Sequence, residues 1–362
     1  MTIKHIEEYR NPEISRKLAD QIKKISRKNI RLMEVCGTHT MSIFRSGIRG
    51  LLPDTISLLS GPGCPVCVTS QNEIDAFIAL ASIDNVIVAT FGDLMRVPGT
   101  SSSLQKERAE GRDIRVVYSS SDALEIAKKN PDKKVVFLGV GFETTAPTIA
   151  ATILSANAMN LNNYFVFSAH KLVPPALSAL MKISNMKTDG FILPGHVSVI
   201  IGMKSYQPFF DQYQIPCVIA GFEPGDILQA VSMLISQIES GSPELANAYP
   251  RAVTDEGNQK ARKIMGDVFE TTDANWRGLG IIPESGLNIR KEFASFDAHK
   301  MADITIPESE EPKGCSCGAI LTGEKIPPEC PLYKKACTPV NPIGPCMVSS
   351  EGTCAAYYRY HR

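Results

Sequence analysis

The chain has 362 residues, and its 38 Lys and Arg residues balance 38 Asp and Glu residues, so its formal net charge is zero. Hydrophobic residues make up 43% and charged residues 21% of the chain, which is ordinary for a globular protein and excludes wholesale disorder. A neutral chain lacks the broad basic surface of nucleic-acid-binding proteins, so we expect no nucleic-acid partner.

The N-terminal segment is charged and lacks the apolar core of a signal peptide, and no later run approaches the ~18 apolar residues of a membrane span. We therefore expect a soluble, cytoplasmic protein without a membrane partner. Residues 12–28 are predicted to form a helix, because Asn11 is a good N-cap and Pro12 suits the first turn. We expect this N-terminal helical segment, residues 1–29, to pack on the C-terminal domain.

From residue 30 onward, short apolar strands alternate with glycine-rich or polar turns and helices, which predicts an α/β fold with parallel sheets. The predicted strands are 30–35, 56–59, 86–89, 116–118, 135–140, 165–167, 191–193 and 218–220. We divide this region into two α/β domains that face a cleft, residues 30–115 and 116–224. A helix over 227–239 closes the region.

Residues 225–362 are predicted to form a third domain. Beyond its first helix, this segment is rich in Pro, Gly and Cys and has few periodic stretches. Such a composition offers little apolar area for folding without a metal. We therefore expect a loop-rich domain that metal–thiolate bonds hold together.

Ten cysteines in a protein of a reducing compartment indicate metal binding or thiol chemistry rather than a disulfide framework. They form two groups, and Cys217 stands alone. The front group is Cys36, Cys64 and Cys67, and the tail group is Cys315, Cys317, Cys330, Cys337, Cys346 and Cys354.

Many of the polar residues that can carry chemistry follow the predicted strands, at the strand ends where ligands bind in open parallel sheets. They are Cys36, His39, Cys64, Cys67, Asp93, Glu143, Thr144, His170, His196 and Glu223. This shared placement predicts that the turns line one cleft.

Cys36 lies in MEVCGTHT, between a predicted strand and a helix whose N-terminus favours a thiolate. His39 is close enough in sequence to share a ligand or to hold a proton. The alternative is a buried structural cysteine beside a helix-capping threonine.

GPGCPVC places Cys64 and Cys67 in a Cys-x-x-Cys motif, which suits either a redox dithiol or half of a zinc site. A zinc site needs a second pair of ligands, for which only Cys36 and His39 are candidates. We favour the redox dithiol.

GFETTAP lacks the glycine spacing of a dinucleotide site, and the chain contains no P-loop motif. Glu143 is a candidate general acid or base, unless the threonines after it simply cap the next helix. His170 and His196 also follow strands, and we weigh a role in the cleft evenly against a structural one.

The tail cysteines are the strongest signal in the sequence. Four thiolates can hold a [4Fe–4S] cluster or a zinc ion, and the remaining two can form a disulfide beside it. The alternative is a zinc knot with two free thiols.

Taken together, these segments closely resemble the HypD family of [NiFe]-hydrogenase maturation factors, over essentially the whole chain. The resemblance is carried by MEVCGTHT, GPGCPVC, GFETTAP, FSAHKLVPPA, ILPGHVSVIIG, AGFEP, CPLYKKACTP and GPCMVSSEGTCAAYYRY. It implies two α/β domains around a cleft and a C-terminal domain with one [4Fe–4S] cluster. It also implies a complex with the small chaperone HypC, on which an Fe(CN)2CO group is assembled before transfer to the hydrogenase large subunit, with cyanide delivered by HypE.

The resemblance also implies roles for single residues. Cys36 is the thiolate that binds the iron of the Fe(CN)2CO group, with His39 beside it, and Cys64 and Cys67 are the redox dithiol. The implied cluster ligands are Cys315, Cys330, Cys337 and Cys354, which leaves Cys317 and Cys346 as a second redox pair. As a hypothesis, electrons pass from the cluster through Cys317–Cys346 and Cys64–Cys67 to chemistry at Cys36, while Glu143, His170 and His196 shape the cleft or move protons.

We therefore expect a redox-active scaffold for metallocentre assembly rather than an enzyme of ordinary turnover. The main alternative is a thiol–disulfide oxidoreductase with a purely structural C-terminal metal site. A weaker alternative is a hydrolase that uses Cys36 and His39 as a dyad.

Overall fold

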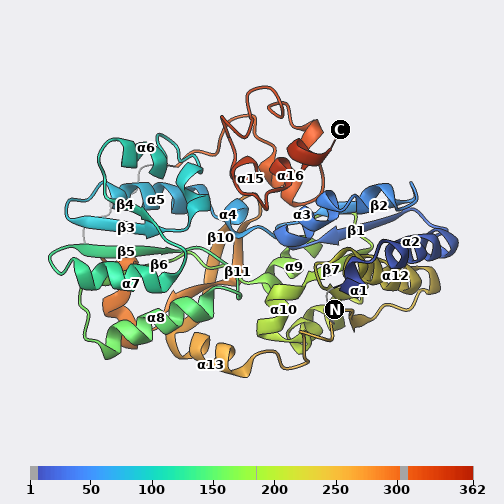
Figure 1. The fold of residues 1–362 in the computed structure, drawn as a ribbon, viewed down its shortest axis with the longest axis horizontal. Coiled ribbons are helices and arrows are strands. Elements are labelled where there is room, and N and C mark those ends of the chain that lie inside the picture. The colour runs from blue at the N-terminus through green and yellow to red at the C-terminus, as the bar shows by residue number, and fades with distance from the viewer. Residues whose placement is uncertain (1–6, 185, 302–308, 362) are drawn as a thin grey trace.

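The computed structural model describes residues 7–184, 186–301 and 309–361, and the structural statements below concern these residues. Two parallel sheets lie side by side, and the cysteine-rich C-terminal segment lies above the junction between them (Figure 1). The predicted α/β class with a loop-rich C-terminal part is confirmed.

The first sheet has the strand order β2-β1-β7-β8-β9, and all its strand pairs are parallel. Its strands are β1 (Ile30–Glu34), β2 (Ile56–Ser60), β7 (Gly190–Pro194), β8 (Cys217–Ala220) and β9 (Leu245–Asn247). Every residue of β7 and β8 is buried, as is usual for parallel strands covered on both faces. The covering helices include α3 (Gly37–Arg45), α9 (Val173–Met181), α10 (Gly195–Ile201) and α12 (Pro224–Ser240).

The second sheet has the order β4-β3-β5-β6 and is also parallel. Its strands are β3 (Val86–Thr90), β4 (Ile114–Val116), β5 (Lys134–Gly139) and β6 (Tyr164–Ser168). In the view of Figure 1, α5 (Gln71–Ala81) lies above this sheet, and α7 (Ser120–Lys129) and α8 (Ala146–Ala158) lie below it.

The strand pairing divides the chain differently from the expected domains 30–115 and 116–224. The first sheet takes strands from both ends of this region, and the second sheet is built entirely from the segment between them. The reason is that β1 is a central strand, which pairs with β2 on one edge and with β7 on the other. A boundary at residue 115 would also separate β3 from its partner β5.

The N-terminal helix is confirmed as α2 (Pro12–Ile25), where the Asn11 side chain accepts a hydrogen bond from the N–H of Glu13. It packs on α12, beside which it lies in Figure 1, and therefore belongs to the first sheet's layer of helices. We expected this helix to pack on the C-terminal domain, residues 225–362. It packs on α12, at the start of that domain, and not on the cysteine-rich segment. The strand predicted at 116–118 instead ends at Val116, and Ser119 caps the next helix.

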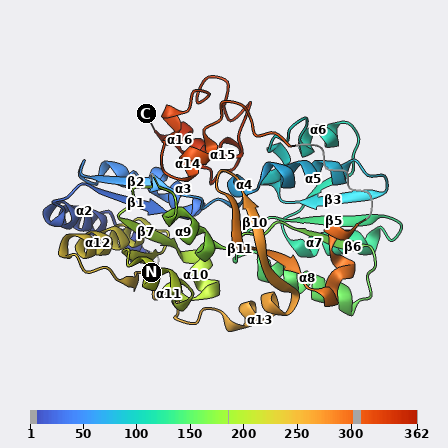
Figure 2. The ribbon, with the colours of Figure 1, turned by 180° about the vertical axis from the view of Figure 1, so that it is seen from behind.

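A hairpin that the sequence analysis missed stands between the two sheets (Figure 2). It is formed by the antiparallel strands β10 (Phe269–Trp276) and β11 (Gly280–Ile289), which follow α13 (Gln259–Val268). Isolated bridges join Trp276 to Thr69 and Gly286 to Lys171. The hairpin thus links the segment after the Cys-x-x-Cys motif to the end of the second sheet.

The cysteine-rich segment contains only short helices, which are α14 (Cys317–Leu321), α15 (Pro345–Val348) and α16 (Thr353–Tyr360). The remaining helices are α1 (Glu7–Arg10), α4 (Pro65–Val68), α6 (Leu104–Ala109) and α11 (Gln207–Tyr213), with 3-10 turns at Ile48–Gly50, Gly92–Arg96, Met203–Tyr206, Lys291–Phe296, Ala298–Lys300 and Pro327–Glu329. Among the described helices, none has the length and apolar character needed to cross a membrane.

Candidate functional site

Cys36 lies at the carboxyl end of β1, beside the point where the strand order of the first sheet reverses. From β1 the chain builds β2 on one side and later returns to build β7 on the other, which leaves a crevice outside the ends of β1 and β7. Cys36 is the N-cap residue of α3. The loop after β2 packs directly against it, because Gly37 donates its N–H to the carbonyl of Gly63 at 2.8 Å.

The buried carboxylate of Glu34 holds this turn in place. Its Oε2 accepts a hydrogen bond from the N–H of Cys36 at 3.0 Å, and its Oε1 accepts one from the hydroxyl of Thr40. Burial raises the pKa of Glu34 to about 8. The sequence analysis did not select Glu34, although an acidic residue at the end of a mostly apolar strand indicates a buried carboxyl group.

Burial opposes ionisation of the Cys36 thiol. Desolvation raises its pKa to about 12, although the N–H groups of His39 and Thr38 lower it in part. Burial therefore outweighs the favourable effect that we expected from the start of the helix. A bound cation reverses this balance, because a thiol that coordinates a metal loses its proton.

His39 is fully buried beside the same turn. Its Nε2 lies 2.9 Å from the carbonyl oxygen of Gly221 and 3.2 Å from that of Ala220, so this nitrogen carries the proton. Nδ1 has no hydrogen-bond partner and keeps its lone pair. Burial lowers the pKa of His39 to about 4. The ring of Phe222 stacks on both His39 and His196, with centroid distances of 4.7 and 3.8 Å.

A cavity of about 400 Å³ lies at the crevice, where turns from both sheets meet. Of the ten residues predicted to line one cleft, only Cys36, Thr144 and His196 line this cavity. Cys36 and His196 line it from the first sheet, Phe142 and Thr144 from the second, and Glu351 from the cysteine-rich segment. The hydroxyl of Thr38, another lining residue, donates to Oε1 of Glu351 at 2.6 Å. Glu351 is a second acidic residue that sequence reasoning missed.

Glu143 lies next to this cavity, but its carboxylate points to the start of α9. Its Oε1 accepts a hydrogen bond from the N–H of Val173 at 2.9 Å, whereas Oε2 is buried without a partner. Burial raises the pKa of Glu143 to about 7. Thr145 is the N-cap residue of α8, but its side chain makes no capping hydrogen bond.

His170 follows β6 and lies against the hairpin rather than in the lining of the cavity. Its Nδ1 is 2.9 Å from the hydroxyl of Ser168, its Nε2 has no partner, and its ring lies 5.3 Å from that of Phe269. Burial lowers its pKa to about 3. Asp93 accepts a hydrogen bond from Ser349, and Glu223 pairs with Arg10 at 2.7 Å.

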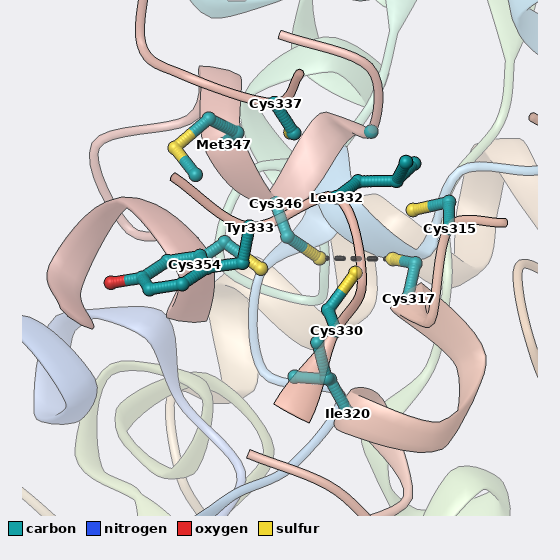
Figure 3. Close-up of a pocket in the computed structure, with 11 residues that line it drawn as sticks. Cys315, Cys317, Ile320, Cys330, Leu332, Tyr333, Cys337, Cys346, Met347 and Cys354 are labelled. Atoms are coloured by element: carbon teal, nitrogen blue, oxygen red, sulfur yellow. Dashed lines mark hydrogen bonds between the residues drawn. The ribbon is translucent and has the colours of Figure 1, made fainter. Parts of the chain in front are cut away.

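Four cysteines, two from the front group and two from the tail group, form a row that joins the Cys-x-x-Cys motif to the tail cavity. The N–H of Cys67 donates to Sγ of Cys64 at 3.2 Å, and the Sγ atoms of Cys317 and Cys346 are 3.0 Å apart (Figure 3). The neighbouring thiols of Cys317 and Cys67 lower the pKa of Cys346 well below its ordinary value. Cys346 therefore lies between the two pairs and is the thiol whose ionisation its neighbours favour.

All six tail cysteines line one small cavity, together with apolar side chains that include Ile320, Leu332 and Met347 (Figure 3). The contact between Cys317 and Cys346 sets those two apart and leaves the four cysteines Cys315, Cys330, Cys337 and Cys354. Among the described residues, no group of three or more His, Cys, Asp or Glu side chains is arranged to hold a single metal ion.

These four thiols line a shared space, and the charges of neighbouring cysteines act on two of them. After desolvation, the charges of neighbouring cysteines raise the pKa of Cys354 well above its ordinary value and that of Cys315 to about 12. Backbone N–H groups outweigh desolvation at Cys330 and lower its pKa. Such a ring of soft donors in an apolar pocket suits a cationic iron–sulfur cluster, which relieves the repulsion.

The chain was also compared with known proteins. The family model described as "HypD: Hydrogenase formation hypA family" matches residues 13–361. The hydrogenase maturation factor HypD of Cupriavidus necator is 45% identical and is aligned over 99% of this chain and 98% of its own. HypD of Escherichia coli is 41% identical over 99% of both chains. A hydrogenase expression/formation protein of Methanocaldococcus jannaschii is 45% identical over 96% of this chain and 97% of its own.

Proposed function

The chain belongs to the HypD family of hydrogenase maturation factors, and on this premise we propose that it is a redox-active scaffold for iron-group assembly. Together with HypC, it assembles the Fe(CN)2CO group of [NiFe]-hydrogenase in the cytoplasm before transfer to the large subunit. Cyanide comes from HypE as a thiocyanate. The single observation that carries the proposal is the row of sulfur atoms between the tail cavity and the segment beside Cys36.

The incoming iron is the cargo, and Cys36 is its thiolate ligand. A soft thiolate suits low-spin iron with cyanide and carbonyl ligands, and the crevice limits contact with water. Glu34 fixes the Cys36 backbone. His39 presents an unprotonated Nδ1 that has no other partner, so it is the base available in this turn.

The two dithiols exchange electrons by thiol–disulfide exchange. The Cys346 thiolate attacks Sγ of Cys67 in a Cys64–Cys67 disulfide, and Cys64 leaves as a thiolate. Cys317 then attacks Cys346 and gives its proton to the departing Cys67. Two electrons thus pass to the front pair, and the Cys317–Cys346 disulfide forms. The influence of the Cys67 thiol, which lowers the pKa of Cys346, supports this order of attack.

The reduced front pair releases cyanide from its carrier. The Cys64 thiolate attacks the sulfur of the thiocyanate, forms a mixed disulfide with the carrier and expels cyanide, which binds the iron at Cys36. Cys67 then closes the Cys64–Cys67 disulfide and transfers its proton to the carrier thiolate. The step consumes the two electrons that the exchange delivered.

The donor set of the tail cavity fits a [4Fe–4S] cluster, which Cys315, Cys330, Cys337 and Cys354 would hold. When bound, such a cluster supplies single electrons at low potential. Ile320, Leu332 and Met347 exclude water from these thiols. The contact between Cys317 and Cys346 keeps that pair out of the ligand set.

Infrared spectroscopy on the protein co-purified anaerobically with HypC tests this function, because cyanide and carbonyl ligands absorb where protein does not. Cys36→Ala should lose these bands while the cluster iron is unchanged. Cys217→Ala is the matched control, since Cys217 is also a buried thiol whose pKa burial raises to about 12. Bands retained in Cys36→Ala would refute the role of Cys36, and isotope-labelled cyanide traces its delivery.

A thiol–disulfide oxidoreductase with a structural metal site is the second candidate, because the row of sulfur atoms alone can perform exchange. It predicts turnover with small disulfides that survives the loss of iron. Loss of this turnover on iron removal, with the fold retained, would exclude it.

A further inference from the structure

A single turn of chain separates the tail cavity from solvent at the loop before Cys337. The N–H of Cys337 closes this turn by donating to the carbonyl of Leu332 at 2.9 Å. Leu332, Tyr333 and Cys337 line the tail cavity, whereas Lys334 and Lys335 between them are exposed. The cavity therefore comes close to the surface under a turn that carries two positive charges.

The chain after this turn forms one wall of a groove of about 350 Å³. Val340 and Pro342 line the groove from the tail, and α6 and the segment before it line the groove from the side of the second sheet. The guanidinium of Arg96 donates to the carbonyl of Pro339 and so joins the two walls. Val340 is 91% exposed, so the groove has an apolar side chain facing solvent at its edge.

Exposed cations lie around the groove and on the turn over the tail cavity. We call this set the basic face, and it consists of Arg96, Lys106, Lys334 and Lys335. None of the four is paired with a carboxylate among the described residues. The sequence from 330 to 350 contains no acidic residue, and the two glutamates of this part of the chain, Glu107 and Glu110, do not line the groove. The positive charge of this face is therefore available to a partner.

We propose that the basic face docks a small, acidic electron-carrier protein that supplies electrons to the tail. The inference rests on the proposed function, in which the tail cavity holds a [4Fe–4S] cluster. Because such a cluster exchanges single electrons, its reductant is a one-electron carrier rather than a dithiol. Each encounter oxidises the carrier by one electron. Two encounters supply the two electrons that return the Cys317–Cys346 disulfide to two thiols, with two protons from water.

The make-up of the basic face suits a transient partner of this kind. Weak encounters between electron-transfer proteins use small interfaces, in which an apolar centre is surrounded by a polar rim. Here Val340 provides the apolar contact, and unpaired cations surround it. Opposite charges on the two partners steer the encounter and raise the association rate.

The test measures binding of an oxidised two-cluster bacterial ferredoxin of net negative charge to the full-length, cluster-containing protein under anaerobic conditions. Calorimetric titration at about 0.01 M and about 0.15 M ionic strength gives the affinity and its dependence on salt. Lys334→Glu/Lys335→Glu should weaken binding about tenfold at the lower ionic strength. Lys23→Glu/Lys24→Glu is the matched control and should bind like the parent. It makes the same change in net charge on two adjacent exposed lysines of α2, which lies at the opposite end of the molecule from α6 (Figure 1).

Carbodiimide cross-linking, which joins lysine amines to carboxylates, locates the bound ferredoxin without requiring electron transfer. We expect cross-links to Lys106, Lys334 or Lys335. Cross-links confined to other lysines would overturn the inference, and so would equal affinities of the two double variants. If Lys334→Glu/Lys335→Glu loses iron, Lys106→Glu, which lies on α6 outside the tail, decides the question, and an affinity equal to that of the parent overturns the inference. Failure of the proposed function is distinguishable, because the parent protein itself would then contain no iron–sulfur cluster.

Discussion

Replacement of Gly63 by alanine tests the packing of the Cys-x-x-Cys loop against the iron-binding turn. A Cβ atom built on Gly63 would lie 2.0 Å from the backbone nitrogen of Cys36 and 2.3 Å from the carbonyl carbon of Val35. Ordinary contacts of a Cβ atom lie at 3.4–4 Å, and both crowded atoms are backbone atoms that cannot rotate away. The two segments must therefore move apart by about 1 Å or more.

The expected cost follows from this movement. Overpacking costs about 1–3 kcal/mol, and the hydrogen bond from Gly37 to Gly63 adds about 1 kcal/mol when it breaks. We expect Gly63→Ala to lower the free energy of unfolding by about 2–4 kcal/mol. It should also weaken iron binding at Cys36, because the turn that presents the thiol shifts, while the iron of the tail cluster is retained.

The assay combines denaturant unfolding with infrared bands of the iron group and the iron content. Gly50→Ala is the matched control, because no atom lies within 4 Å of the Cβ position and Gly50 has no positive φ. Its effect should stay within about 0.5 kcal/mol. A Gly63→Ala protein with the parent's stability and infrared bands would show that the loop does not pack on Cys36 as described.

Two further predictions concern the tail and the second sheet. Cys337→Ala should lower the iron content and the thermal stability of the cysteine-rich segment together, because metal binding and folding are coupled there; an iron content equal to that of Cys217→Ala would exclude Cys337 as a ligand. Glu143 stabilises the fold fully below its ordinary pKa of 4.5, and this contribution is lost as the pH rises through the folded-state value of about 7. Between pH 5 and 8 the loss amounts to about 2.5 kcal/mol, so the free energy of unfolding of Glu143→Gln should fall less steeply over this range than that of the parent. Parallel urea-unfolding curves across the same pH range would contradict the buried, protonated carboxyl.

Strands β1 to β8 could be predicted because each is a short apolar run followed by a turn of glycine or polar residues, whereas the short edge strand β9 was missed. Their partners could not, because β1 has buried residues on both faces and nothing in its sequence tells whether β2, β3 or β7 pairs with its second edge. The hairpin was missed for a different reason. In Phe269–Trp276 only the two end residues are buried, so the strand has no apolar alternation to reveal it.

The candidate site was predicted where chemistry and position coincide. Cys36, Cys64 and His196 follow strands β1, β2 and β7, which are neighbours in one sheet. The rule that ligands bind at the carboxyl ends of parallel strands was therefore sufficient to group these three residues. Glu34 escaped prediction, because a charged side chain in the sequence looks solvent-exposed until the tertiary structure buries it. The different roles of Cys315, as an implied cluster ligand, and Cys317, as a member of a redox pair, came from the family resemblance. The 3.0 Å contact between the Sγ atoms of Cys317 and Cys346 supplies a physical reason for this assignment.

The two thiol centres do not depend on each other equally. Glu351 belongs to the tail segment, and its side chain accepts a hydrogen bond from the hydroxyl of Thr38. It also packs on Gly37, because a Cβ atom added to Gly37 would lie 2.5 Å from the Cβ of Glu351. The tail therefore forms one wall of the crevice around Cys36, whereas Cys36 contributes nothing to the lining of the tail cavity. The tail is anchored by apolar side chains such as Ile320, Met347 and Tyr357, which pack into the same core as Phe44, and under the proposed function metal–thiolate bonds would add to this anchoring. Under the proposed function, removal of the tail metal should therefore change the shape of the crevice, whereas removal of iron from Cys36 should leave the tail in place.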